Sequence, residues 1–231
     1  TISGGATLEF ENNAADLSIG VEPTGVGILT VDGEFALLVV PDNHLIGDEG
    51  LGRMEVLNGG TVITSDSINT ARLGASATGV GTVLVEGLGS IWQIEDNLTI
   101  GGGGEGTLII RDNGLVDIDN GGSVTTVGPR GRLELFEGVY AGAGTSVSGV
   151  LAGSGRVTGA VTVANSGMVD VPVDALLQFS GDVSNAGSLR IQGGEATVSG
   201  MLENLAPAGG AAGGRITLEA GRLRFASPLT Q

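Results

Sequence analysis

The sequence holds a single histidine, His44, and no cysteine, so triad-type nucleophilic catalysis has one candidate base. No serine or cysteine nucleophile motif accompanies this histidine. His44 also shares its position, at intervals of 27 residues, with residues that are expected to face a core: Leu17, Ala71, Leu98 and Thr125. We therefore expect His44 to be a buried structural residue and not a catalytic base.

Carboxylates are the most plentiful reactive groups, with 26 Asp and Glu residues against 10 arginines, no lysine and a net charge of −16. A glycosidase needs two carboxylates about 5–10 Å apart, and the candidate pairs are Glu95 with Asp96 and Asp117 with Asp119. So many acidic residues produce such pairs by chance, and aromatic residues that grip sugars make up only 3% of the chain. We expect no enzymatic activity; the alternative is a carbohydrate-active or carbohydrate-binding protein.

Calcium is the ion that the sequence favours, because Asp112–Gly121 is rich in hard oxygen ligands. The run Gly101–Gly106 is similar to a calcium-binding glycine repeat, but Glu105 replaces the aspartate and no tandem copy follows. The run lacks the Gly-Lys-Ser/Thr ending of a phosphate loop. We expect no cofactor and no metal site, with Ca²⁺ as the alternative.

The charge and hydropathy of the chain exclude two classes of partner. A net charge of −16 repels the phosphates of nucleic acid, and no basic patch is visible. No stretch approaches the roughly 18 uninterrupted apolar residues of a transmembrane helix. We therefore expect neither nucleic-acid binding nor membrane insertion.

A period of 27 residues organises the first half of the chain. An apolar residue followed by glycine recurs with its glycine at Gly20, Gly47, Gly74, Gly101 and Gly128. A second glycine follows each of these and opens a run of alternating apolar residues, such as Gly81–Val85 and Gly106–Ile110. Such alternation indicates a strand with one buried face, and a stack of identical units can bury what one unit cannot.

The pattern predicts an all-β, single-domain, right-handed parallel β-helix with three strands per coil, in which each strand pairs with its counterpart one coil on. Regular 27-residue coils are expected over 17–140, and shorter coils of the same solenoid over 141–231, where related runs begin at Gly159, Gly181 and Gly200. The segment Ala206–Gly214 is expected to be a looped-out turn. The whole chain, 1–231, is thus expected to be one solenoid of about eight to nine coils.

Stacking of the coils predicts specific contacts. Glu86 and Arg111 should form an ion pair between adjacent coils, and Leu29, Met54, Val83, Leu108 and Leu133 should form one buried ladder. Outside that ladder, Leu84 and Ile109 should form a small exposed apolar patch that Phe136 widens. A threonine array of the ice-binding kind is not expected, because arginine interrupts the column that holds Thr82 and Thr107.

The segment Gly81–Trp92, followed by Leu98–Gly101 and Gly106–Ile110, resembles the β-solenoid repeat shared by autotransporter (type V secretion) passengers and PEP-CTERM-associated surface proteins. The segment Ser148–Val163 resembles the late passenger region of autotransporters. The likeness covers roughly residues 17–200 and implies a structural rod, extracellular or at the cell surface, within an adhesin, matrix or fibre protein. Its Gly-Ser-x-Trp step occurs once, and we expect the chain to be a piece or a matured form of a longer protein.

Both ends of the solenoid are expected to be open. The first ten residues and Arg222–Phe225 both read as strand, and unpaired strand edges recruit other chains. The expected partners are other copies of the chain, stacked head to tail, or adjoining solenoid sequence; a surface polysaccharide is a further candidate. Because the net charge opposes stacking, we expect salt or divalent cations to favour it.

Overall fold

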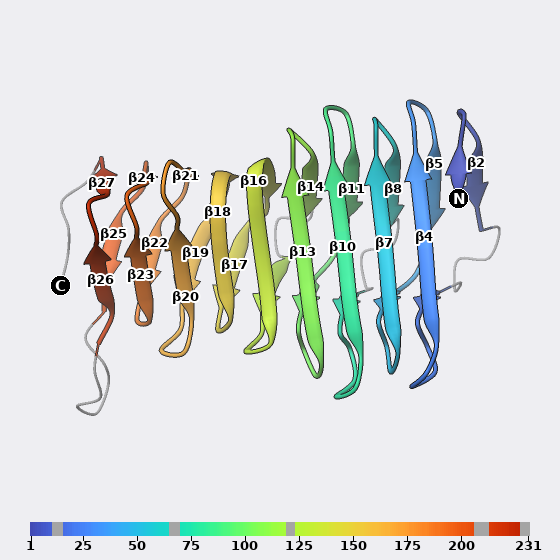
Figure 1. Ribbon diagram of the computed structural model, residues 1–231, viewed down its shortest axis with the longest axis horizontal. Coiled ribbons are helices and arrows are strands. Elements are labelled where there is room, and N and C mark those ends of the chain that lie inside the picture. Colours follow the sequence, from blue (N-terminus) through green and yellow to red (C-terminus); the bar gives the residue numbers. More distant parts are fainter. Residues whose placement is uncertain (11–15, 65–69, 119–122, 206–212, 227–231) are drawn as a thin grey trace.

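The computed structural model describes residues 1–10, 16–64, 70–118, 123–205 and 213–226 and confirms the predicted parallel β-helix. In Figure 1 the near strands run upward, the far strands return downward and the chain advances from right to left, so the coil is right-handed. All strand pairings in these ranges are parallel, for example Val26–Asp32 with Leu51–Leu57 and Leu17–Ile19 with His44–Ile46. None of these ranges contains a helix long and apolar enough to cross a membrane.

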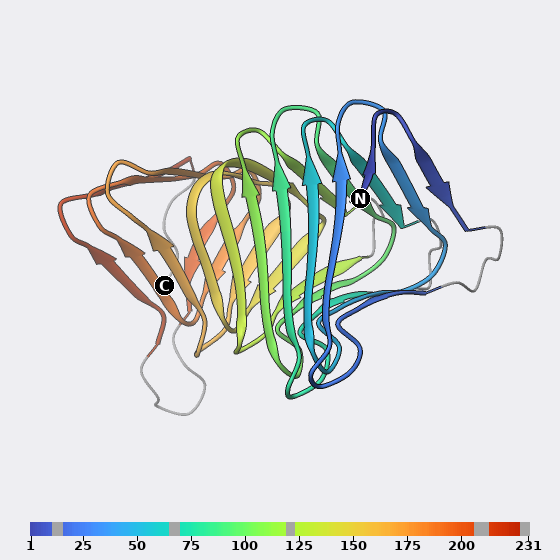
Figure 2. The ribbon, with the colours of Figure 1, turned by 45° about the vertical axis from the view of Figure 1, so that its right-hand side comes forward.

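Each coil contributes to three faces, which Figure 2 shows enclosing a narrow interior. The first face contains β1 (Ile2–Ser3), β4 (Val26–Asp32), β7 (Leu51–Leu57), β10 (Val80–Glu86), β13 (Glu105–Arg111), β16 (Gly131–Ala141), β18 (Val150–Val157), β20 (Met168–Val171), β23 (Ser188–Ile191) and β26 (Arg215–Leu218). The second contains β2 (Thr7–Glu9), β5 (Leu37–Val40), β8 (Thr61–Thr64), β11 (Ile91–Ile94), β14 (Leu115–Ile118), β21 (Leu176–Phe179), β24 (Glu195–Val198) and β27 (Arg222–Phe225). The third contains β3 (Leu17–Ile19), β6 (His44–Ile46), β9 (Ala71–Leu73), β12 (Leu98–Ile100), β15 (Val124–Val127), β17 (Gly144–Val147), β19 (Ala160–Val163), β22 (Val183–Asn185) and β25 (Leu202–Asn204).

The coils shorten along the chain because turns disappear. On the third face the paired residues are 27 apart from Leu17 to Thr125. The next steps, from Thr125 through Thr145 to Val161, are 20 and 16 residues. Here β16 and β18 each span the first two faces as one bent strand, and β16 changes register at an irregularity beside Phe136. The bend replaces a turn, so fewer residues close each coil.

The core is the inward side of these strands. The expected ladder is confirmed: Met54, Val83, Leu108 and Leu133 are fully buried and in register, and Leu29 is partly buried near the N-terminal end. The cluster of buried apolar residues runs from Ile2 to Leu202, along the stack of coils that Figure 1 shows.

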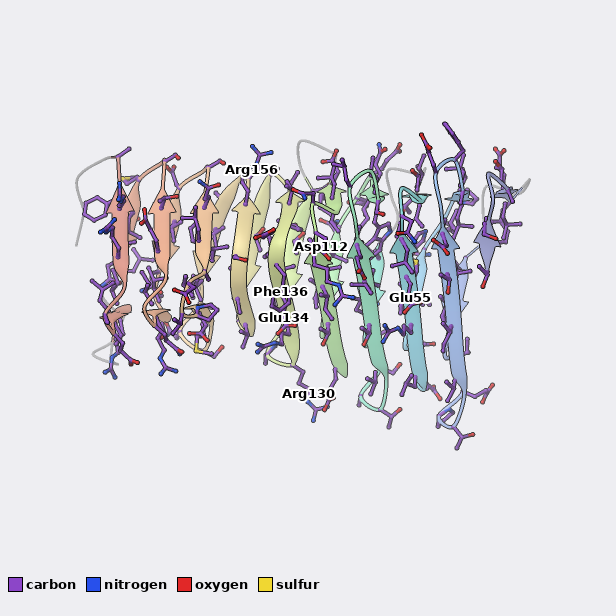
Figure 3. The ribbon with its side chains drawn as sticks, turned by 45° about the horizontal axis from the view of Figure 1, so that its top comes forward. Glu55, Asp112, Arg130, Glu134, Phe136 and Arg156 are labelled. Carbon is purple, nitrogen blue, oxygen red and sulfur yellow. The ribbon has the colours of Figure 1, made fainter. Side chains whose placement is uncertain are left out.

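The expected exposed patch on the first face is wrong for Leu84, which is only 5% exposed. Its neighbours in the adjacent strands, Glu55 and Ile109, lie directly beside it and cover it. Ile109 is itself half-buried. Phe136 does not widen the patch, because Ile109 pairs with Glu134. Figure 3 shows Phe136 and Glu134 side by side on the middle coils, and Phe136 is 48% exposed.

Two columns of glycine form the corner between the third and first faces. Gly47, Gly74 and Gly101 have φ of 68°, 65° and 71°, which is left-handed backbone that suits glycine. A Cβ on Gly74 would lie 2.2 Å from the carbonyl oxygen of Glu105 one coil on. In the second column, a Cβ on Gly81 would lie 2.0 Å from the carbonyl oxygen of Ile46. The corner therefore requires glycine for both conformation and space.

We expect Gly74→Ala to lower the free energy of unfolding by about 2 kcal/mol or more, because backbone strain and overpacking act together. Gly144→Ala is the matched control: its φ lies outside the left-handed region and a Cβ there meets no atom within 4 Å. Denaturant unfolding followed by circular dichroism measures both variants. Equal midpoints for the two variants would contradict the packing described for this corner.

Candidate functional surfaces

His44 lies in the core, as predicted, in register with Leu17 and Ala71. Its Nε2 is 3.2 Å from the Thr64 hydroxyl, and its ring stacks on Trp92 with centroids 6.1 Å apart. Burial lowers the pKa of His44 to about 3, since a charged imidazole would lose its hydration. The residue is thus a neutral core side chain that no substrate at the surface can reach.

One member of the first candidate carboxylate pair, Asp96, belongs to an inter-coil brace, whereas Glu95 accepts a hydrogen bond from the Ser123 hydroxyl through its backbone carbonyl. The Asn97 side chain donates to the Asp96 carboxylate at 2.6 Å and accepts the backbone N–H of Val124, one coil on, at 2.8 Å. Asn43, two coils earlier, makes the same two contacts with Asp42 and with the backbone N–H of Thr70. The repetition of an Asp-Asn pair at an interval of 54 residues was the sequence signal for this brace, and our sequence analysis missed it.

The second candidate pair is not assembled within the described residues. Asp117 lies on β14, beside Gln93 of β11 and Ala141 of β16, whereas Asp119 lies outside the described residues. The calcium candidate Asp112–Gly121 and the loop Ala206–Gly214 also extend beyond them. Within the described part of Asp112–Gly121, Asp112 and Asn113 form a turn with φ of 53° and 65°. No group of three or more potential metal-ligating side chains occurs in the described ranges.

Ion pairs line the outer side of the first two faces. The predicted pair is confirmed: Glu86 lies opposite Arg111, and Oε2 of the glutamate is 2.6 Å from Nη2 of the arginine. Pairs of this exposure contribute about 0.2–1 kcal/mol each. The others in the described ranges are Arg53–Glu55, Arg132–Glu134, Arg190–Glu219, Arg222–Glu195 and Arg224–Glu195.

One pocket that groups acidic side chains lies near the C-terminal end of the stack, on the turns between the first two faces. It has a volume of about 400 Å³, and Asp174, Glu195 and Arg222 line it together with glycine, alanine and leucine. Glu195 is already paired with Arg222 and Arg224, at 3.5 and 2.8 Å. No aromatic side chain lines the pocket. The pocket therefore offers hydrogen bonds and charge to a ligand, but no ring on which a sugar could stack. Another, smaller pocket lies on the first face and is lined by Glu134 and Asp170 with Arg132 and Phe136.

The two end coils present their core-facing side chains and their strand edges. At the N-terminal end Leu8, in register with the buried Leu38, is 44% exposed. At the C-terminal end Leu218 and Phe225, in register with buried residues of β23 and β24, are 52% and 41% exposed. Within the described residues no strand pairs with the outer edges of β1, β2, β26 and β27.

Comparison with known proteins gives one relative. The chain is 31% identical over 150 residues to the uncharacterized lipoprotein YdeK of Escherichia coli (strain K12). The match covers 58% of this chain and spans only 11% of the length of that protein. No family model matches the chain, and no solved structure matches it.

The burial of His44 makes the stability of the fold depend on pH. Its pKa falls from about 6.5 in the unfolded chain to about 3 when folded, so its stabilising contribution is complete above pH 6.5. Between pH 6.5 and 3 the unfolded state takes up the proton, and stability falls by about 1.4 kcal/mol per pH unit. We expect His44→Leu, which places in this column the residue type of Leu17 and Leu98, to remove this slope between pH 6.5 and 5. Denaturant unfolding at four pH values measures the free energy of unfolding of the parent and the variant. If this free energy depends on pH equally in both proteins, the result contradicts burial of a neutral imidazole.

Proposed function

We propose that the chain is a structural rod, a β-solenoid segment of an adhesin, matrix or fibre protein that is displayed at the cell surface. The observation that carries this proposal is the unbroken parallel stack of coils, with one hydrophobic core from Ile2 to Leu202 and the charged side chains on the outside. Of the described acidic side chains that the sequence offers for catalysis, Asp96 belongs to a brace between coils and Asp117 lies beside Gln93 and Ala141. These features suit a rigid spacer that acts by holding other parts of a protein at a distance.

The location at the cell envelope is supported by the relative. YdeK is called a lipoprotein, a class of protein anchored to membranes by lipid, and its similarity to the chain favours an envelope location. The resemblance of the repeat to autotransporter passengers and PEP-CTERM-associated proteins supports the finer proposal that the chain faces the exterior. The net charge of −16 keeps such a surface well solvated.

A polysaccharide-binding or polysaccharide-cleaving solenoid is the second candidate, and the C-terminal pocket is the observation that favours it. Asp174 and Glu195 supply two carboxylates there, and Arg222 supplies a cation. Since Glu195 is held by two arginines, a ligand must displace or share those ion pairs. Polysaccharide binding at this pocket is therefore a weaker candidate function than the structural rod.

The two functions separate in one experiment with matched variants. We expect antibody labelling of intact source cells to detect the chain outside, and Gly74→Ala to reduce this labelling because it disturbs the coil. Asp174→Asn with Glu195→Gln should leave labelling unchanged, and the purified chain should show no binding to a panel of bacterial and host polysaccharides. Polysaccharide binding or cleavage that the pocket variant abolishes would instead establish the second candidate. Recovery of the chain only in the cytosolic fraction would overturn the surface rod.

A further inference from the structure

One outward column of the second face is apolar over three successive coils. Ile91 of β11, Leu115 of β14 and Val139 of β16 occupy paired positions, and all three side chains are half-buried. Thr61 precedes them in the column, and Arg156 of β18 follows them. The three apolar residues, called the apolar strip below, therefore end at a guanidinium group.

The turns between the first and second faces convert the apolar strip into a pocket. Leu88, in the turn before β11, and Asn113, in the turn before β14, line it together with the strip and Arg156, and its volume is about 350 Å³. Leu88 is 83% exposed. No carboxylate lines this pocket. Figure 3 shows Arg156 projecting from the edge of the middle coils, so the pocket is far from both ends of the stack.

Arg156 carries a positive charge that no acidic side chain neutralises within the described residues. Its next neighbour in the column is Gln178, which is neutral. An arginine keeps its charge at every ordinary pH. The arginines of the neighbouring outer strands are all ion-paired: Arg53, Arg111, Arg132, Arg190, Arg222 and Arg224. Arg156 is therefore free to bind an anionic group at the end of the apolar strip.

The backbone beneath the apolar strip favours an alkyl chain over a peptide. β14 pairs with β11 on one side and with β16 on the other. A peptide that adds to a sheet needs a free strand edge, and the middle of this face offers none. An alkyl chain needs no hydrogen bonds and gains free energy by covering apolar surface.

We propose that this pocket binds one molecule of a small amphiphilic carboxylate of the fatty-acid class. The carboxylate lies on Arg156, whose guanidinium can donate two parallel hydrogen bonds to it. The alkyl chain lies along Val139, Leu115 and Ile91. Three coil spacings separate Ile91 from Arg156, which gives about 14 Å. A chain of about ten carbons and its head group cover that length, since carbon–carbon bonds measure about 1.5 Å. This ligand goes beyond the rod function and does not depend on it.

The test is isothermal titration calorimetry of the whole 231-residue chain with decanoate, below the concentration at which decanoate forms micelles. We expect one decanoate to bind per chain. Butanoate should bind at least tenfold more weakly, because its short chain leaves most of the apolar strip uncovered.

Matched variants assign the head group and the tail. Arg156→Gln should weaken decanoate binding by about tenfold, since it removes the charge-assisted hydrogen bonds. Arg72→Gln is its control, because Arg72 is an exposed arginine of the third face that also forms no ion pair within the described residues. Leu88→Ser should weaken binding by about fivefold. Its control is Val173→Ser, which changes a 66% exposed residue in a turn outside this pocket.

Several results would overturn the proposal. These are a parent chain that binds no decanoate, equal binding of decanoate and butanoate, unchanged affinity in Arg156→Gln or Leu88→Ser, and an equal loss of affinity in either control. Association with phosphatidylglycerol vesicles without binding of free decanoate would also overturn it and would indicate a bilayer surface as the partner. Circular dichroism checks that each variant keeps its fold. A chain that binds no decanoate but is labelled at the cell surface retains the rod function.

Discussion

The close approach of backbone to backbone at the glycine corner is the constraint on which the rest of the solenoid depends. Coils stack only if each strand lies directly over its counterpart. At the corner between the third and first faces the backbone segments lie so close that a Cβ added to a glycine would be 2.0–2.5 Å from a backbone atom. Glycine removes that atom and permits the left-handed conformation of Gly47, Gly74 and Gly101. The 27-residue interval of these glycines follows from this geometry, since every coil turns the same corner.

The same constraint explains why the period fades. Gly128 continues the glycine column in sequence, but its backbone is no longer in the left-handed region. Beyond it the coils close through bent strands, and the close approaches move to Gly138, Gly153 and Gly155. The glycine content persists because the backbone still passes close to its neighbours, but at different positions in the coil. A fixed interval therefore ends while a parallel stack continues.

Contacts that repeat from coil to coil could be predicted from sequence, and contacts between faces could not. Spacing alone placed Glu86 opposite Arg111 and Leu108 in the core, because both follow from register along one face. The stacking of His44 on Trp92 joins the third face to the second, and no periodicity relates those positions. The burial of Leu84 depends on its lateral neighbours and not on the side of the strand it occupies. The Asp-Asn brace was visible in sequence, but its meaning required the geometry of the turn between the second and third faces.

Parallel stacking also dictates where charge can lie. Identical positions in successive coils are about 4.8 Å apart, so like charges in one column repel. The outward column of the first face respects this: Glu55 and Glu134 are separated by two apolar coils, Leu84 and Ile109, and each glutamate is paired with an arginine on its own strand. Arginine is absent from the first 50 residues, so acidic side chains there lack this neutralisation. The charged side chains of this column are thus neutralised by arginine in the middle coils, whereas the acidic residues of the first 50 positions have no arginine among them, which gives the rod a charge asymmetry that a stack of identical coils would not have.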